Sequence, residues 1–242
     1  MFDGLEMGIF PLVARPALLE MRGTASAVGD GYVGHWMGII TALFLVGAAI
    51  GGLVFGWLGD RVGRVRAMSL AILCYSVFTG AAYFAGTPLQ LGLLRFVAAL
   101  GMGGEWSLGV ALVMEIWPEK HRPLLAGVIG AAANVGFALV GLIGILVPVT
   151  PDSWRWMMLL GAGPALLTFF IRLFVPESPR WLESARTSPG RPLREILSAP
   201  LLRTAVLATV FASIALIGSW GSVQWLPLWA DQMAGSGEPH AK

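Results

Sequence analysis

The feature that most constrains this chain is a series of long stretches without any charged residue. Asp, Glu, Lys and Arg are absent from residues 36–58, 67–94, 123–151, 156–171 and 204–230. Roughly 18 apolar residues are enough for a helix to span a bilayer, and only the run at 156–171 falls just short of that length. Charged residues make up 12% of the chain, whereas a soluble domain uses about a quarter. The sequence therefore predicts an all-α protein that crosses a membrane several times.

Turn signals and charged loops divide the chain into seven expected helices. The Gly-Thr-Pro turn at 86–88 separates the third helix from the fourth. The helices are expected at about residues 2–20, 33–58, 66–85, 89–116, 124–149, 154–175 and 202–229. Residues 1–175 would then form a six-helix bundle, 176–201 a cytoplasmic linker, and 202–242 a seventh helix with the start of an outer loop. Pro227 is expected to break the seventh helix.

The distribution of arginine indicates which helix ends face the cytoplasm. The loops after the second, fourth and sixth helices are rich in Arg and Lys, whereas the turn at 86–88 has none and that at 150–155 has only Arg155. The first connection, with Arg15 and Arg22, is the exception. By the positive-inside rule, the arginine-rich loops lie in the cytoplasm of a protein integral to the plasma (inner) membrane. Because the positive charge sits between spans, it does not indicate a nucleic-acid partner.

Four ionisable residues fall within the expected first and fourth helices: Asp3, Glu6, Arg95 and Glu105. Such residues are costly in hydrocarbon and usually face a water-filled pathway or one another. Asp3 and Glu6 share one helix face, and Arg95 and Glu105, about 80° and about 15 Å apart on an ideal helix, can border one cavity. A carboxylate beside an arginine can couple a proton to a solute, since protonation releases the arginine. Purely structural ion pairs are the alternative.

Three loop segments carry recognisable motifs. The segment GWLGDRVGRVR at 56–66 resembles the G-x-L-x-D-R-x-G-R-[KR] signature of the major facilitator superfamily. EIWPEKHR at 115–122 resembles that superfamily's E-x-x-P-x-x-x-R element, and PESPRWL at 176–182 resembles the same motif in sugar porters and related metabolite/proton symporters. Their positions after the second, fourth and sixth helices indicate a bundle of this family, covering residues 2–230.

Two further segments are similar to aromatic-acid and sialate-type symporters of the same superfamily. FDGLE at 2–6 is similar to their D-G-x-D motif, and RFVAALGMGGEW at 95–106 is similar to their fourth-helix motif. The resemblance implies a 3+3 inverted repeat in which the first and fourth helices flank a central cavity. It also implies that Glu6 is the proton-titrating acid, Arg95 its partner, and Asp3 and Glu105 acids of the cavity. Trp106 and Gln224 could line that cavity, although membrane tryptophans are more often interfacial.

The loop motifs also predict a gate on the cytoplasmic side. Glu115, about 160° around its helix from Arg95, is expected to serve this second site. Acids and bases of the loops would pair across helix ends, and two glycines would permit close helix contact and a turn. The expected gate residues are Gly56, Asp60, Arg61, Gly63, Arg64, Glu115, Arg122, Glu177 and Arg180. The alternative is that the arginines are simply solvated at the lipid headgroups.

The function that these observations predict is proton-coupled symport of a small organic solute, an organic acid or a sugar, by alternating access. Catalytic, metal-binding and dinucleotide motifs are not found, so neither an enzyme nor a cofactor is expected. The superfamily has twelve helices in two halves, and the chain is therefore expected to be a fragment that needs a C-terminal half for transport. A non-transporting membrane receptor or scaffold on the same fold is the alternative.

Overall fold

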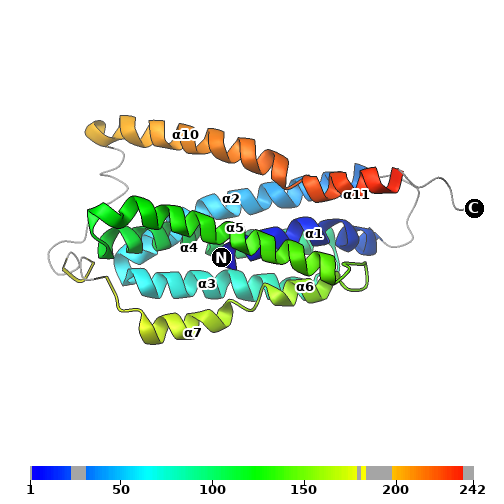
Figure 1. Ribbon diagram of the computed structural model, residues 1–242, viewed down its shortest axis with the longest axis horizontal. Coiled ribbons are helices and arrows are strands. Elements are labelled where there is room, and N and C mark those ends of the chain that lie inside the picture. The colour runs from blue at the N-terminus through cyan, green and yellow to red at the C-terminus, as the bar shows by residue number, and fades with distance from the viewer. Residues whose placement is uncertain (1, 23–30, 179–180, 184–197, 237–242) are drawn as a thin grey trace, which may run out of the picture. The chain divides into compact units, whose positions relative to one another are not determined.

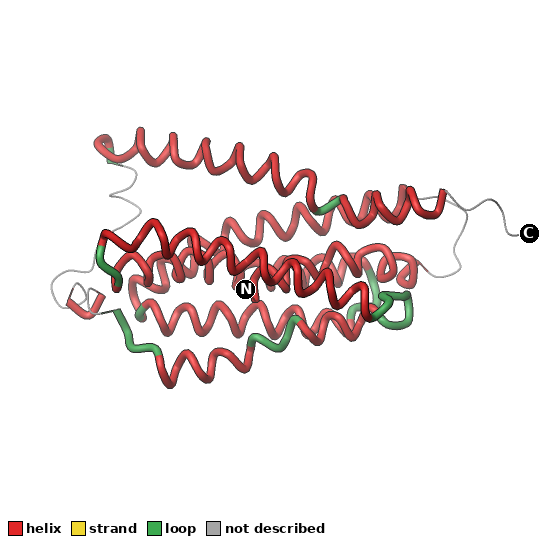
Figure 2. Tube along the Cα trace, in the orientation of Figure 1, coloured by secondary structure: helices red, strands yellow, loops and turns green. Residues whose placement is uncertain are grey.

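The computed structural model describes residues 2–22, 31–178, 181–183 and 198–236. Within these ranges the chain forms helices and no strand, as the trace in Figure 2 shows. The expected all-α fold class is therefore confirmed. The chain divides into two compact units, residues 1–188 and 189–242, and each is described by itself. Arg180, one of the expected gate residues, lies outside the described residues.

The first unit contains most of the helices (Figure 1). In chain order they are α1 (Phe2–Arg22), α2 (Gly31–Val62), α3 (Arg64–Ala81), η1 (Ala82–Phe84), α4 (Pro88–Ile116), η2 (Glu119–His121), α5 (Arg122–Leu146), α6 (Trp154–Leu160) and α7 (Ala165–Phe174). The second unit contains α10 (Ala199–Val223) and α11 (Leu226–Ser236).

Five helical stretches of the described residues are long and apolar enough to cross a membrane: Gly31–Val62, Arg64–Phe84, Pro88–Ile116, Glu119–Leu146 and Leu201–Ala230. The helix α1 spans 21 residues but carries charges along its whole length, from Asp3 to Arg22. Its polar side chains need partners from neighbouring helices, which the buried site described below supplies.

The expected single helix over 154–175 is interrupted, and that prediction is wrong. The helix α6 ends at Leu160, and α7 begins at Ala165. Pro164 has no N–H to donate to the carbonyl of Leu160, so the regular ladder cannot continue. The backbone crosses the break with short-range bonds instead, including Gly163 N to Leu160 O and Ala165 N to Ala162 O, both at 3.0 Å.

In the second unit, a similar interruption separates α10 from α11. The helix α10 ends at Val223, and α11 begins at Leu226. Pro227 lies in the first turn of α11, where a missing N–H costs little. The expected break near Pro227 is thus present, although the proline begins a new helix rather than ending the old one.

The turn between α3 and α4 is built by side chains that cap the helix start. Thr87 accepts a hydrogen bond from Gln90 N at 3.2 Å, and Gln90 Oε1 accepts one from Gly86 N at 3.0 Å. Pro88 is the first residue of α4, where its fixed φ favours the helix. These contacts confirm the turn predicted at 86–88.

Small residues bring α2 and α4 into backbone contact. A Cβ added at Gly51 would overlap the carbonyl of Leu100, and one added at Gly103 would overlap the carbonyl of Ala48. This close approach suits a membrane bundle, in which the hydrophobic effect gives helices little reason to associate. Between α2, α3 and α4 lies a core of buried side chains: Phe44, Ile72, Tyr75, Ala98, Ala99 and Met102.

Candidate functional site

A buried ion pair joins α1 to α4. Arg95 Nη1 contacts Glu6 Oε1, and the side chains are 2% and 0% exposed, respectively. The Arg95 guanidinium also lies over two aromatic rings, 5.1 Å from the centroid of Phe10 and 4.7 Å from that of Phe44. Rings that face a guanidinium stabilise its charge where water cannot. The two residues singled out on the first and fourth helices are therefore direct partners.

A third helix also contributes to this pair. Thr79 of α3 donates a hydrogen bond from Oγ1 to Glu6 Oε1 at 2.9 Å. Two donors thus converge on one carboxylate oxygen, while Glu6 Oε2 and Arg95 Nε are buried without a hydrogen-bond partner in the described part of the chain. Sequence reasoning missed Thr79, because a threonine in an apolar run carries no signal of its own.

The other two intramembrane acids form a second group next to the core. The side chains of Asp3 on α1 and Glu105 on α4 lie close to each other and are largely buried. The buried hydroxyl of Tyr75 lies beside Glu105, but it makes no hydrogen bond of good geometry in the described structure. Arg95 and Glu105, expected to border one cavity, therefore belong to two neighbouring groups.

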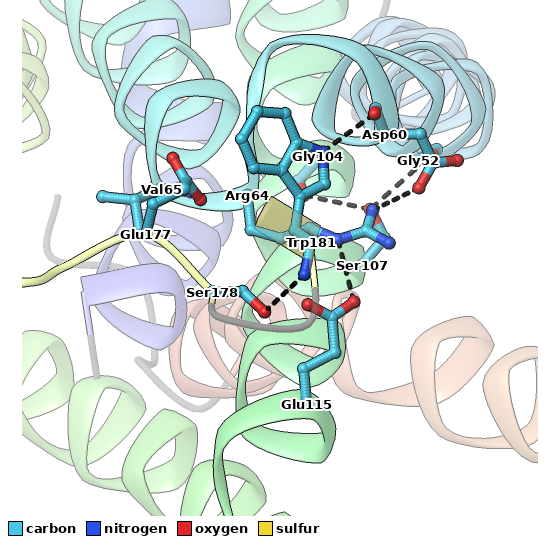
Figure 3. A network of polar contacts seen from close by, with 10 residues as sticks. All are labelled: Gly52, Asp60, Arg64, Val65, Gly104, Ser107, Glu115, Glu177, Ser178 and Trp181. Atoms are coloured by element: carbon cyan, nitrogen blue, oxygen red, sulfur yellow. Dashed lines mark hydrogen bonds and ion pairs between the residues drawn. The ribbon is translucent and has the colours of Figure 1, made fainter. Parts of the chain in front are cut away.

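At the arginine-rich end of the bundle, Arg64 bridges α2 and α4 (Figure 3). Its Nη1 lies 2.6 Å from Asp60 Oδ1, and its Nε lies 3.0 Å from Glu115 Oε1. The three side chains are partly exposed, between 17% and 33%. The fork of the guanidinium allows one residue to hold two acids from different helices at once.

Two described residues of the PESPRWL segment, Glu177 and Trp181, form hydrogen bonds at the same end of the bundle. Glu177 Oε1 accepts a hydrogen bond from Val65 N at 2.8 Å, so its carboxylate caps the N-terminus of α3. A carboxylate at this position satisfies a free backbone N–H and suits the positive end of the helix dipole. Trp181 Nε1 donates to the backbone oxygen of Asp60 at 2.8 Å, which ties the segment to α2 as well (Figure 3).

Gly63 makes this arrangement possible. Its φ of 113° and ψ of 149° are conformations that only glycine adopts readily. A Cβ added here would also overlap the Glu177 carboxylate. The predicted turn role of Gly63 is confirmed, but that of Gly56 in tight contact is not, since a Cβ there would lie 3.9 Å from Ser107 Oγ. The tight glycine is Gly59, where a Cβ would overlap Leu108.

Two of the expected gate arginines have other partners. Arg61 is exposed and lies over the ring of Trp57, 4.3 Å from its centroid. Arg122 folds back on its own loop, where Nε donates to Trp117 O at 3.2 Å and Nη1 lies 3.5 Å from Glu119. The expectation that these two residues pair across helix ends is not met, because nearer partners are available on the adjacent turn.

The opposite end of the bundle holds a cluster that the sequence did not suggest. Arg155 forms an ion pair with Glu20 at the end of α1. It also donates from Nε to Tyr83 O at 3.0 Å and from Nη2 to Ala85 O at 2.9 Å. One side chain therefore joins α1, the turn after α3 and the start of α6. From the sequence, Arg155 stood out only as the single basic residue of the turn at 150–155, since carbonyl acceptors leave no sequence signal.

The remaining predicted residues are less informative. Trp106 is 37% exposed on α4. Gln224 belongs to the second unit, where it follows the last residue of α10. In the described residues, no group of three or more His, Cys, Asp or Glu side chains is placed to hold a metal ion.

Apolar helices of membrane-spanning length, packed through glycine around buried charges, define an integral multi-pass membrane protein. Residues 7–239 match the family model described as Major Facilitator Superfamily, and the chain belongs to that family.

Curated relatives agree with this assignment. The chain is 33% identical over 230 residues to the “Probable 4-methylmuconolactone transporter” of Cupriavidus pinatubonensis, covering 93% of this chain and 51% of that relative. It is 36% identical over 146 residues to the inner membrane metabolite transport protein YgcS of Escherichia coli, covering 60% of this chain and 33% of that relative. The chain thus spans about half the length, or less, of these curated relatives.

A solved structure shows the same fold. The partially occluded inward-open form of the xylose transporter XylE from E. coli matches with a TM-score of 0.71, over 96% of this chain and 63% of that chain. The sequence identity is 19%, so this likeness supports the fold alone.

Proposed function

We propose that this chain forms the N-terminal bundle of a proton-coupled transporter for a small organic solute. The observation that carries the proposal is the buried Glu6–Arg95 pair, which joins α1 to α4 and lies against the rings of Phe10 and Phe44. Glu6 is the proton acceptor, and Arg95 is the group that its protonation releases. A freed guanidinium in an apolar bundle attracts an anionic or strongly polar solute.

The proposed solute is an organic acid rather than a neutral sugar. Arg95 supplies a positive charge at the site, which favours a carboxylate. Two relatives are named for related compounds: a 4-methylmuconolactone transporter and the cis,cis-muconate transport protein of Acinetobacter baylyi, 29% identical over 208 residues. Small dicarboxylates and lactones are therefore the first solutes to test.

We further propose that the arginine-rich end is cytoplasmic and acts as a gate. The supporting observations are the Arg64 bridge and the Glu177 cap, which join α2, α3, α4 and the segment after α7 at one end of the bundle. Alternating access requires such contacts to form and break between states. A partner bundle would complete the passage, with lipid around both.

Proton-driven uptake tests the proposal. The chain is reconstituted in lipid vesicles, alone and together with the C-terminal bundle of the 4-methylmuconolactone relative, and uptake of labelled cis,cis-muconate is measured with and without an inward proton gradient. We expect the gradient to accelerate uptake at least several-fold, and Glu6→Gln to abolish that acceleration. Glu119→Gln, which changes an acid that is 87% exposed, is the matched control.

Two results would contradict the proposal. The first is unchanged proton coupling in Glu6→Gln, which would remove the acid from the mechanism. The second is an absence of uptake of cis,cis-muconate, 4-methylmuconolactone and xylose in both reconstitutions, which would favour a receptor or scaffold on this fold.

A further inference from the structure

Thr79 contacts the proposed proton acceptor directly, although it belongs to none of the motifs. Its side chain is fully buried, and its hydroxyl donates to Glu6 Oε1, the same oxygen that Arg95 contacts. Because both donors use Oε1, the other oxygen, Oε2, remains without a hydrogen-bond partner in the described residues. Protonation of Glu6 is therefore favoured at Oε2, because a proton on Oε1 would displace the hydrogen bonds from Thr79 and Arg95.

The opposite side of Thr79 is fixed by the interruption between α6 and α7. A Cβ added at Gly161 would overlap Thr79 Cγ2 and would lie 3.3 Å from Thr79 Cβ. One residue along α3, a Cβ added at Gly80 would lie 2.9 Å from Ala162 Cβ. The backbone of the break therefore packs directly against this turn of α3.

This packing decides where the hydroxyl points. A threonine in a helix has two accessible orientations, one of which turns its hydroxyl back to the carbonyl three or four residues earlier. With the methyl group held against Gly161, the hydroxyl is directed at Glu6. An unbroken helix with a side chain at position 161 could not approach so closely.

We propose that Thr79 is a positioning residue for Glu6, and that the interruption at 161–164 serves to hold Thr79 in place. The hydroxyl stabilises the ionised carboxylate and directs protonation to Oε2. Among the residues that the structure describes, the charged and titratable groups near Glu6 are Arg95 on α4, Asp3 on its own helix, and Glu105 and Tyr75 beside Asp3. Only the link to transport rests on the proposed function; the effect on Glu6 itself does not.

Infrared spectroscopy of the chain in lipid tests this inference without any need for transport. The carboxyl band that Glu6→Gln removes is assigned to Glu6, and its intensity is followed against pH. Thr79→Val keeps the shape of the side chain but removes the donor. We expect the pH midpoint of the band to move to higher pH by about one unit, because the ionised form of Glu6 loses one hydrogen bond and a hydrogen bond to a charged group corresponds to a shift of about this size. Thr79→Ser keeps the donor and should stay close to the wild type.

A second pair of variants tests the role of the interruption. Gly161→Ala should displace Thr79 and move the midpoint in the same direction as Thr79→Val. Gly141→Ala is the matched control, since a Cβ there meets nothing within 4 Å. The inference is overturned if Thr79→Val titrates like the wild type, or if Thr79→Ser shifts as far as Thr79→Val. Failure of proton-driven uptake would overturn the proposed function and leave this titration result unaffected.

Discussion

Gly63 and Glu177 meet at the N-terminus of α3, where the carboxylate occupies the space that a side chain at position 63 would fill. The same carboxylate accepts a hydrogen bond from Val65 N at 2.8 Å. The GWLGDRVGRVR segment at 56–66 and the PESPRWL segment at 176–182 therefore meet in one helix cap, although they lie far apart in the sequence. The glycine supplies the space and the unusual backbone, and the glutamate supplies the acceptor that the start of the helix needs.

Substitution of Gly63 should destabilise this end of the bundle. In Gly63→Ala, the positive φ costs about 1–3 kcal/mol, and the new methyl group pushes Glu177 away from Val65 N. We expect a lower thermal unfolding midpoint in detergent. Gly109→Ala is the control, because Gly109 lies within α4 and a Cβ there meets nothing within 4 Å. Equal midpoints for the two variants would show that the Glu177 contact contributes nothing to stability.

The positions of the long helices could be predicted because hydrocarbon demands uninterrupted apolar runs. The boundary at Thr87 was also visible, since its capping contacts are local. The interruption of the sixth helix was not, although Gly161, Gly163 and Pro164 are all plain in the sequence. Glycine and proline also occur within intact membrane helices, as Pro11 and Pro16 do in α1, and only packing against α3 shows that the chain breaks here.

The candidate site was predictable to the extent that its members are charged. Glu6 and Arg95 stood out because an ionised group in an apolar helix is energetically costly and usually has a partner or a functional role. Thr79 and the carbonyls of Tyr83 and Ala85 gave no such signal, because hydroxyl and backbone groups are common in any helix. The pairing of Glu6 with Arg95 was implied by the resemblance to the symporter motifs, whereas spacing within one helix could not determine it, because the pairing depends on how α1 packs against α4.

Replacement of Arg64 by lysine should weaken the contacts that hold the arginine-rich end of the bundle together. Lysine keeps the charge, but a single ammonium group cannot hold Asp60 and Glu115 in the geometry of the guanidinium fork. We expect Arg64→Lys to loosen the arginine-rich end by about 0.5–1 kcal/mol, an effect that salt reduces. The measurement is the maleimide labelling rate of Ser69→Cys in a Cys74→Ala background, since Ser69 is buried in α3.

Labelling should be faster by a few-fold in Arg64→Lys than in the parent. Arg66→Lys provides the control, because Arg66 is exposed on the same turn of α3. If the labelling rates of Arg64→Lys and Arg66→Lys coincide, the bridge does not hold this end closed.

The Glu6–Arg95 pair should reveal itself through its energetic coupling. Removal of either partner leaves a buried, uncompensated charge, at a cost of about 3–5 kcal/mol, whereas removal of both leaves none. We therefore expect Glu6→Leu and Arg95→Met each to lower the thermal unfolding midpoint strongly, and the double variant to recover most of the loss. Additive losses in the double variant would show that the two charges do not compensate each other.

Arg155 should matter more to stability than the acid that it pairs with. Arg155→Lys loses the donors to Tyr83 O and Ala85 O as well as the fork that reaches Glu20, about 1–3 kcal/mol in total for partly exposed contacts. Glu20→Gln keeps an oxygen that can still accept from Trp154 Nε1, so its effect should be smaller.

Thermal unfolding at low and high salt separates the two contributions. The loss in Glu20→Gln is largely electrostatic and should shrink at high salt, whereas the loss of bonds to neutral carbonyls in Arg155→Lys should persist. Asp152→Asn, an exposed acid of the same loop, is the control. If Glu20→Gln and Arg155→Lys lower the unfolding midpoint equally, and high salt reduces both losses, then Arg155 acts only as a member of a surface ion pair. Its bonds to Tyr83 O and Ala85 O would then contribute nothing to stability.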